Sequence, residues 1–278
     1  MTPSQSIRVG SLSIGGGEPF VLIAGPCVIE DEELTFRIAR FLKDLTGELE
    51  IPFIFKASYD KANRTSHDGY RGPGLVLGLE ILGAIREELG IPVLCDVHRF
   101  EEIDPASRVL DVLQVPAFLC RQTDFVEEIA RKAKAVNVKK GQFLAPWDAV
   151  RIAEKVVEAG NRQLMLTERG VSFGYNNLVV DFRAFPILRE TGYPVIFDAT
   201  HSVQLPGGGG RASGGDRRMV PFLARAAVAA GIDGLFFEVH PDPDRALCDG
   251  PNSLALEGLR GLLVCLRRIE AAVRECRE

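Results

Sequence analysis

The sequence contains no apolar run long enough to cross a membrane. Hydrophobic residues make up 46% of the chain, but no uninterrupted run approaches the roughly 18 residues of a membrane helix. The most apolar stretch, residues 222–239, is broken by Arg225 and Asp233. The start, MTPSQSIRVG, has neither a basic leader nor an apolar signal core. We therefore expect a cytoplasmic protein without a membrane partner.

Closely spaced cysteine pairs are also absent. Six cysteines are spread along the chain, and no two of them form a Cys-x-x-Cys motif. In a cytoplasmic enzyme this usage predicts reduced thiols rather than a disulfide scaffold. The chain also has no excess of basic residues, and its net charge is -5. That balance argues against nucleic acid as a partner.

Short apolar runs that end in polar residues recur eight times between Phe20 and Glu238. In chain order they are FVLIAGPC, PFIFKAS, PVLCDVH, VLQVP, AVNVKK, QLMLTERG, PVIFDATH and GLFFEVH. Runs of this length, rich in β-branched residues and each followed by a helical pattern, are typical of βα units. They predict an α/β protein with a closed (β/α)8 barrel, whose strands end at one active-site mouth. The length of 278 residues fits one such barrel, so we expect a single domain over residues 1–278.

Apolar stripes with helical spacing predict helices between the strands. They fall at residues 34–45, 75–85, 125–134, 149–160, 182–190, 220–231 and 254–274, and Pro105 limits a helix at 101–109 to a short one. Residues 1–19 form an extension before the first strand, with apolar residues alternating around glycines 15–17. We interpret this extension as a β-hairpin that closes the bottom of the barrel.

Two long connections interrupt the alternation of strands and helices. Residues 58–74 follow the second strand, and the glycine-rich residues 203–218 follow the seventh. Loops of this length inside a compact domain are either functional or disordered. Both lie on the side of the barrel where the strands end, so we expect the glycine-rich loop to act as a substrate lid.

Basic residues follow several predicted strands, although the chain as a whole is acidic. They are Lys61, Arg64, Lys139 and Arg169, and Lys56 ends the second strand. A lysine buried at a strand end costs several kcal/mol to desolvate unless an anion pairs with it. The pattern favours a pocket for small phosphorylated anions, and an ion pair with Asp96 or Glu168 is the alternative. Lys140 follows Lys139 directly, so strand alternation should point it to the opposite face and make one of the two structural.

Two further features of the predicted mouth suit anionic ligands. Gln114 ends the fourth strand with a neutral donor and acceptor, fit for a substrate carboxylate or for a core hydrogen bond. The segment KANRTS, residues 61–66, combines a lysine, an amide, an arginine and two hydroxyls. Arginine binds phosphate through two parallel hydrogen bonds, and a hydroxyl adds a further donor. We interpret the segment as a phosphate-binding loop, with an ordinary polar loop as the alternative.

A candidate metal site also emerges from the strand ends. Cys27, His201 and Glu238 end the first, seventh and eighth strands, and the first and eighth strands are neighbours in a closed barrel. Asp249 follows in the next loop. One thiolate, one imidazole and two carboxylates suit Fe²⁺, Zn²⁺ or Mn²⁺ rather than Mg²⁺ or Ca²⁺. The spacing alone leaves open that Cys27 is a buried small hydrophobe and His201 a hydrogen-bonded loop residue.

Taken together, these segments resemble the 3-deoxy-D-manno-octulosonate 8-phosphate synthases. The matching segments are AGPC, FKASYDKANRTS, YRGPG, DVH, PAFLCRQTD, NVKKGQFLAPWD, LTERGVSFGYNNLVVDFR, FDATHSVQLPGG and FFEVHPDPDRALCDGP. They run in order from about residue 20 to about residue 255. The resemblance implies a transferase of lipopolysaccharide-precursor synthesis that condenses phosphoenolpyruvate with D-arabinose 5-phosphate.

The resemblance also implies where the substrates bind. Phosphoenolpyruvate would be held by Lys61, Lys139 and Arg169, with Lys56 and Gln114 beside them. The pentose phosphate would be bound by Asn63, Arg64 and Thr65, and the family commonly has serine where Thr65 stands. Arg121 in PAFLCRQTD would reach into a neighbouring subunit's site, since the family forms homotetramers.

The family divides into metal-dependent enzymes with cysteine at the position of Cys27 and metal-independent enzymes with asparagine there. Cys27 therefore implies the metal-dependent class, which needs a divalent cation and no organic cofactor. The ligands would be Cys27, His201, Glu238 and Asp249, and the catalytic candidates are Cys27, Lys61, His201 and Asp249. The triplet Cys248-Asp249-Gly250 departs from this pattern, because it is typical of the metal-independent group.

Two other functions compete with this one. The related barrel enzymes that join phosphoenolpyruvate to erythrose 4-phosphate share the metal set and the basic residues, but usually carry Lys-Pro-Arg in the loop where this chain has KANRTS. A non-catalytic barrel that binds sugar phosphates would not need Cys27, His201 and Glu238 together. Both differences favour the octulosonate synthases.

Overall fold

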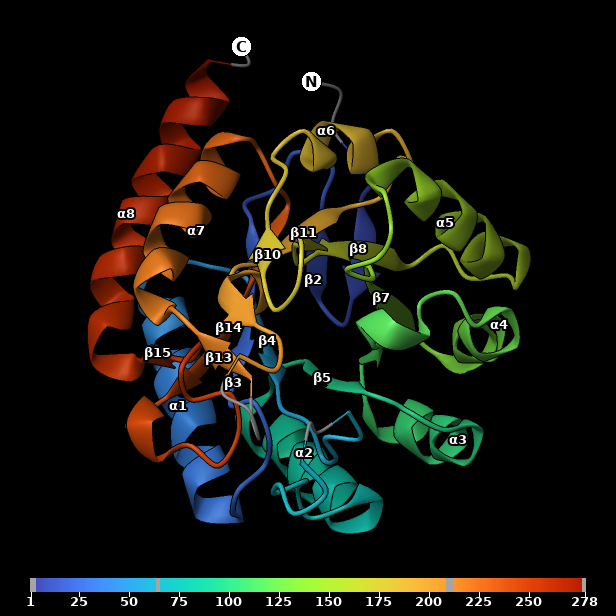
Figure 1. The fold of residues 1–278 in the computed structure, drawn as a ribbon, viewed down its shortest axis with the longest axis vertical. Helices are drawn as coiled ribbons and strands as arrows, with labels where there is room; N and C mark the ends of the chain where they lie inside the picture. Colours follow the sequence, from blue (N-terminus) through green and yellow to red (C-terminus); the bar gives the residue numbers. More distant parts are fainter. Residues whose placement is uncertain (1–3, 64–65, 209–212, 277–278) are drawn as a thin grey trace.

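A computed structural model describes residues 4–63, 66–208 and 213–276, and Figure 1 shows the fold. Its central element is a ring of eight parallel strands, which are β3 (Val21–Gly25), β4 (Phe53–Lys56), β5 (Val93–Asp96), β6 (Val112–Val115), β7 (Ala135–Lys139), β8 (Leu164–Glu168), β11 (Val195–Asp198) and β14 (Gly234–His240). Strand β14 pairs in parallel with both β3 and β11 and so closes the ring. All eight predicted strands are present, and the (β/α)8 barrel is confirmed.

The strands read as continuous apolar runs because both of their faces are buried. Alternate side chains such as Val21 and Ile23 point into the barrel, where they pack with Ile54, Leu94 and Phe236. The intervening residues point outward into a second apolar layer shared with the surrounding helices. Only the strand ends lie outside these two layers, which leaves them available for polar groups.

A small hairpin of β1 (Ile7–Val9) and β2 (Leu12–Ile14) precedes the barrel. Its buried Ile7, Val9 and Ile14 belong to the same cluster as the side chains inside the barrel. The hairpin therefore closes the barrel from the amino ends of the strands, as the sequence predicts. The chain reverses at Gly10, whose φ is 56°, and glycines 15–17 follow the second strand instead of forming the turn.

Helices surround the ring (Figure 1). They are α1 (Glu32–Glu48), α2 (Leu75–Leu89), α3 (Phe100–Val109), α4 (Thr123–Lys132), α5 (Ala149–Glu158), α6 (Ala184–Arg189), α7 (Val220–Ala229) and α8 (Leu256–Glu275). Each predicted helix is found with shifted ends, and α3 is short and contains Pro105. Within the described part of the chain, no helix has the length and apolarity to span a bilayer.

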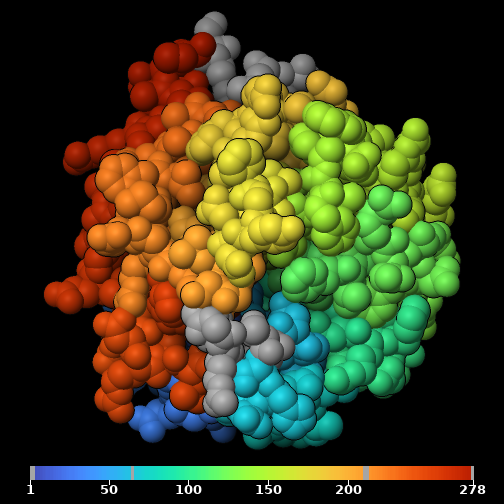
Figure 2. Space-filling view, in the orientation of Figure 1, coloured from blue at the N-terminus to red at the C-terminus, as the bar shows by residue number. Residues whose placement is uncertain are grey.

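Irregular segments and short hairpins cover the mouth where the strands end. The glycine-rich connection carries β12 (Gln204–Leu205), which pairs antiparallel with β13 (Gly214–Gly215). A second hairpin, of β9 (Val171–Ser172) and β10 (Leu178–Val179), follows β8. Figure 2 shows this β9–β10 hairpin, in yellow, on the same face of the molecule as the connection after β4, in cyan. The tip of the expected lid, residues 209–212, lies outside the described residues, so its movement stays a prediction.

Candidate active site

The strand ends converge on one cavity at the mouth of the barrel. It encloses about 1470 Å³ of empty space, part of it open to solvent. Its lining includes Lys56, Lys61, Asn63, Asp96, Gln114, Lys139, Arg169, Asp198, His201, Glu238, Cys248 and Asp249. Residues separated by nearly the whole barrel sequence therefore share one pocket, as the fold requires.

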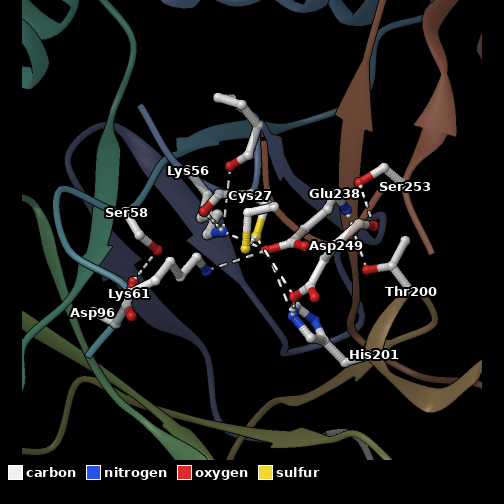
Figure 3. Close-up of polar contacts among 12 residues, drawn as sticks. Cys27, Lys56, Ser58, Lys61, Asp96, Thr200, His201, Glu238, Asp249 and Ser253 are labelled. Carbon is white, nitrogen blue, oxygen red and sulfur yellow. Dashed lines mark hydrogen bonds and ion pairs between the residues drawn. The ribbon is translucent and has the colours of Figure 1, made fainter. Parts of the chain in front are cut away.

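The four predicted metal ligands meet at one side of this cavity. Figure 3 shows Cys27, His201, Glu238 and Asp249 pointing toward one another. The Sγ of Cys27 lies 3.6 Å from an Oδ of Asp249. The Nε2 of His201 lies 3.5 Å from Glu238 Oε1 and 3.9 Å from Asp249 Oδ2. The donors form two overlapping groups that share Asp249: one contains Cys27 and Cys248, and the other contains His201 and Glu238.

Two details of this cluster fit a cation. The second carboxylate oxygen of Glu238, Oε2, is buried and has no hydrogen-bond partner among the described residues. His201 uses its Nδ1 to contact Asp198 Oδ2 at 2.6 Å, which leaves Nε2 facing Glu238 and Asp249. A carboxylate behind the imidazole is the usual support of a metal-binding histidine. The donor set therefore fits the borderline divalent ions that the sequence predicts.

The charges of the cluster also depend on burial. Burial and the neighbouring Cys248 raise the pKa of the Cys27 thiol, so in the metal-free protein it keeps its proton. Burial alone would raise the pKa of Glu238, but the neighbouring His201, Lys56 and Lys61 outweigh it and lower that pKa well below the usual range. Glu238 therefore remains an anion in the interior.

Lys56 is occupied by protein acceptors. Its ammonium donates to Glu238 Oε1 at 2.6 Å and to the carbonyl oxygens of Cys27 at 2.9 Å and Pro26 at 3.3 Å. The side chain is only 1% exposed. These contacts orient Glu238 and the Cys27 backbone, which suits a positioning role more than direct contact with a substrate.

Three other basic residues form the cationic part of the pocket. Burial lowers the pKa of Arg169, whose Nη2 donates to Gln204 Oε1 at 3.0 Å. Its buried Nη1 has no hydrogen-bond partner among the described residues. Burial alone would lower the pKa of Lys61, but Cys27, Glu238 and Asp96 outweigh it and raise that pKa. The Nζ of Lys61 lies 3.6 Å from Glu238 Oε1, so it remains charged at the edge of the metal set.

Lys139 and Lys140 separate as strand alternation predicts. Lys139 faces the cavity, pairs with Asp198 and places its Nζ 3.3 Å from the centre of the Phe236 ring. Burial lowers the pKa of Lys139 to about 8, although Asp198 opposes the shift. Lys140 instead pairs with Glu168 at 3.4 Å and donates to Leu144 O at 3.0 Å. Lys140 is the structural member of the two.

Gln114 makes a hydrogen bond in the core and also lines the cavity. Its Oε1 accepts from Asn137 Nδ2 at 2.9 Å, and Asn137 in turn accepts from Thr167 at 2.6 Å. This network leaves the Gln114 amide group on the cavity wall. Both alternatives that the sequence allows are therefore compatible with the structure.

The remaining predicted residues lie in different places. Asn63 lines the cavity, whereas Arg64 and Thr65 lie outside the described residues. Arg121 is exposed, follows the short helix Ala117–Leu119 and lines a separate hollow with Phe100 and Gln122. The structure of one chain therefore does not bring Arg121 into the cavity that holds the other candidates.

Sequence reasoning gave no role to two residues that the structure places at the site. Asp198 accepts hydrogen bonds from the His201 backbone and from Thr200, in addition to the contacts with the His201 ring and Lys139. Cys248 lies with its Sγ 2.9 Å from that of Cys27. Two features of the sequence could have pointed to them: Asp198 stands three residues before His201, and Cys248 stands directly before Asp249.

The fold and the cavity define a (β/α)8-barrel enzyme whose pocket lies beside buried basic residues and a group of potential metal ligands. The chain matches the DAHP synthetase I family over residues 3–275. A relative from Geotalea uraniireducens (strain Rf4), called 2-dehydro-3-deoxyphosphooctonate aldolase, is 62% identical over 97% of this chain and 99% of its own length. A relative of that name from Desulfosudis oleivorans is 61% identical over 98% of both chains. The chain therefore belongs to the DAHP synthetase I family.

Proposed function

We propose that this chain condenses phosphoenolpyruvate with D-arabinose 5-phosphate and water to give 3-deoxy-D-manno-octulosonate 8-phosphate and phosphate. The observation that carries the proposal is the identity of about 60% over nearly the full length to proteins named 2-dehydro-3-deoxyphosphooctonate aldolase. Another such relative, from Geobacter sp. (strain M21), is 59% identical over 98% of this chain. The KANRTS segment supports the same acceptor sugar.

The reaction makes clear physical demands on the pocket. Carbon C3 of the enol ester bonds to the aldehyde carbon, water adds at C2, and phosphate leaves by cleavage of its bond to C2. Two multiply charged anions must therefore lie side by side. Lys61, Lys139 and Arg169 supply positive charge at the cavity wall, and orientation of the reacting carbons contributes several kcal/mol more.

We assign phosphoenolpyruvate to the basic side of the pocket. The Nη1 of Arg169, which has no hydrogen-bond partner in the described part of the chain, and the ammonium of Lys139 suit its phosphate or carboxylate. Gln114 adds a neutral donor. Asn63 on the cavity wall is assigned to the pentose phosphate, together with Arg64 and Thr65, which lie outside the described residues.

The metal belongs beside these basic residues, where Lys61 Nζ lies 3.6 Å from Glu238 Oε1. Cys27, His201, Glu238 and Asp249 would hold Fe²⁺, Zn²⁺ or Mn²⁺, which polarises an oxygen or acidifies water when bound. The protein's own contribution is to keep Glu238 ionised through Lys56 and Lys61 and to fix the His201 ring through Asp198. Both contacts exist without the ion, so the site is organised in advance.

We further propose a cytoplasmic homotetramer in which Arg121 completes the pocket of a neighbouring subunit. Large aromatic side chains are exposed beside the mouth: Phe118, Phe143 and Trp147 are 54%, 55% and 63% exposed. Exposed apolar groups of this size are typical of interfaces. None of the six cysteines forms a disulfide in the described residues, which agrees with a reducing compartment.

We expect arabinose 5-phosphate to be used in preference to erythrose 4-phosphate. A site built for the longer pentose loses contacts with the shorter acceptor, so kcat/KM should fall by at least roughly tenfold, or about 1.4 kcal/mol. The measurement supplies phosphoenolpyruvate with equal concentrations of both sugars and separates the products by mass spectrometry. Predominance of the seven-carbon product would move the chain to the erythrose-using enzymes.

We also expect phosphoenolpyruvate binding to weaken in alkaline solution. The pKa of Lys139 in the free enzyme is about 8, so its positive charge is present below that pH and is lost as pH rises through it. The KM for phosphoenolpyruvate should then rise by up to about tenfold per pH unit. Steady-state kinetics from about pH 6.5 to about pH 9.5 test this, and a Lys139→Arg variant, which stays charged, should show a flatter profile. A constant KM over that range would contradict the assignment of Lys139.

A further inference from the structure

Two thiols lie against each other at the edge of the candidate metal site. The Sγ atoms of Cys27 and Cys248 are 2.9 Å apart, and the Cys27 thiol donates toward the Cys248 sulfur. Both residues are buried, at 5% and 3% exposure. They stand 221 positions apart in sequence, so the fold and not a local motif brings them together.

Hydrogen bonds fix the backbone at or next to each of the two cysteines. On one side, Lys56 Nζ donates to the Cys27 carbonyl at 2.9 Å. On the other, Asp249 adopts a left-handed φ of 47°, and its carbonyl accepts from the backbone of Asn252 at 3.0 Å and Ser253 at 3.1 Å. A side chain at Gly250 would meet Pro243 O at 2.3 Å, so this turn has room for glycine alone. Cys248 therefore keeps its place beside Cys27.

We propose that Cys27 and Cys248 form a reversible oxidation site that competes with the metal for Cys27. A two-electron oxidant takes one hydrogen from each thiol and joins the two sulfurs. The Sγ atoms then need only approach from 2.9 Å to the roughly 2.05 Å of a disulfide. Cys248 lines the open cavity, so a small oxidant reaches the pair from the mouth.

The competition follows from the chemistry of sulfur. A cysteine binds a metal as thiolate, and a sulfur in a disulfide has no such charge to donate. Oxidation therefore removes the one sulfur donor of the proposed set, and a bound ion in turn protects Cys27. This second half of the inference depends on the proposed metal site, whereas formation of the bridge does not.

The test starts from the full chain, metal-free and reduced, with six titratable thiols. One equivalent of the azo compound diamide takes up the two hydrogens and becomes the hydrazide. We expect two thiols to disappear and a non-reducing peptide map to show the peptides of Cys27 and Cys248 joined, both reversed by dithiothreitol. Zn²⁺ affinity should fall by at least roughly tenfold after oxidation, and Zn²⁺ added first should slow the bridge by a similar factor.

Matched variants separate this pair from the other cysteines. Cys248→Ser should lose the bridge and keep its own Zn²⁺ affinity after diamide, whereas Cys265→Ser should behave like the unmodified chain. The inference would be overturned if diamide lowered the Zn²⁺ affinity of Cys248→Ser as much as that of the unmodified chain. A peptide map of the unmodified chain without the Cys27–Cys248 link would also overturn it. The map uses the unmodified chain, so it decides even if a variant does not fold. Reduced chain that binds no Zn²⁺ but forms the bridge would contradict the metal site and leave the oxidation site standing.

Discussion

Removal of the divalent metal should lower turnover by at least roughly 100-fold, equivalent to about 3 kcal/mol of transition-state stabilisation. The reason is the composition of the cluster, in which Asp249 lies near both Cys27 and His201, and His201 near Glu238. The buried Oε2 of Glu238 has no hydrogen-bond partner among the described residues. The measurement is the rate of phosphate release after dialysis against a chelator, with the metal content of the same sample. Added Fe²⁺, Zn²⁺ or Mn²⁺ should restore the rate, and Mg²⁺ should not.

A pair of variants controls for general damage by the chelator. Cys27→Ala should lose most of the metal and the rate together, whereas Cys265→Ala, which changes a thiol on α8 outside the cavity, should retain both. Full turnover by metal-free chain would place it, despite Cys27, with the metal-independent enzymes that share its Cys248-Asp249-Gly250 triplet.

Replacement of Arg169 by methionine should reduce kcat/KM for phosphoenolpyruvate by roughly 100-fold. Arg169 presents a buried Nη1 donor without a partner among the described residues, and hydrogen bonds between charged groups are among the strongest in proteins. Steady-state kinetics with varied phosphoenolpyruvate check the value. Arg169→Lys should recover only part of it, because lysine cannot make two parallel hydrogen bonds.

Arg183 offers a matched control for this variant. It is exposed, and its side chain pairs with Asp181. Arg183→Met should therefore leave the kinetics within about twofold of the unmodified chain. An unchanged kcat/KM in Arg169→Met, with the fold intact by circular dichroism, would contradict the proposed binding mode.

The barrel could be predicted from sequence because its signal is repeated. Each strand is buried on both faces, so each appears as an apolar run, and closure then fixes where the ends lie. That is why Glu238 on β14 pairs with Gly25 on β3, two residues before Cys27. The bottom hairpin was also predicted, but the position of its turn, at Gly10, was not.

The pairing of charges inside the site could not be predicted. Lys56 ends β4 and Lys61 lies in the next loop, and both line the cavity. Lys56 is engaged by Glu238 and two backbone carbonyls, whereas Lys61 lies 3.6 Å from Glu238. Which lysine meets which carboxylate depends on side-chain direction at the rim, and sequence spacing does not encode it. The contact of Cys248 with Cys27 has the same origin, because it depends on the turn at Asp249.

The most direct test of the account is anomalous diffraction from crystals of the Zn²⁺-loaded chain with phosphoenolpyruvate. We predict one ion at roughly 2.0–2.3 Å from Cys27 Sγ, His201 Nε2 and the carboxylates of Glu238 and Asp249, with the substrate's anionic groups on Lys139 and Arg169. An ion bound elsewhere, or phosphoenolpyruvate bound away from these basic residues, would contradict it.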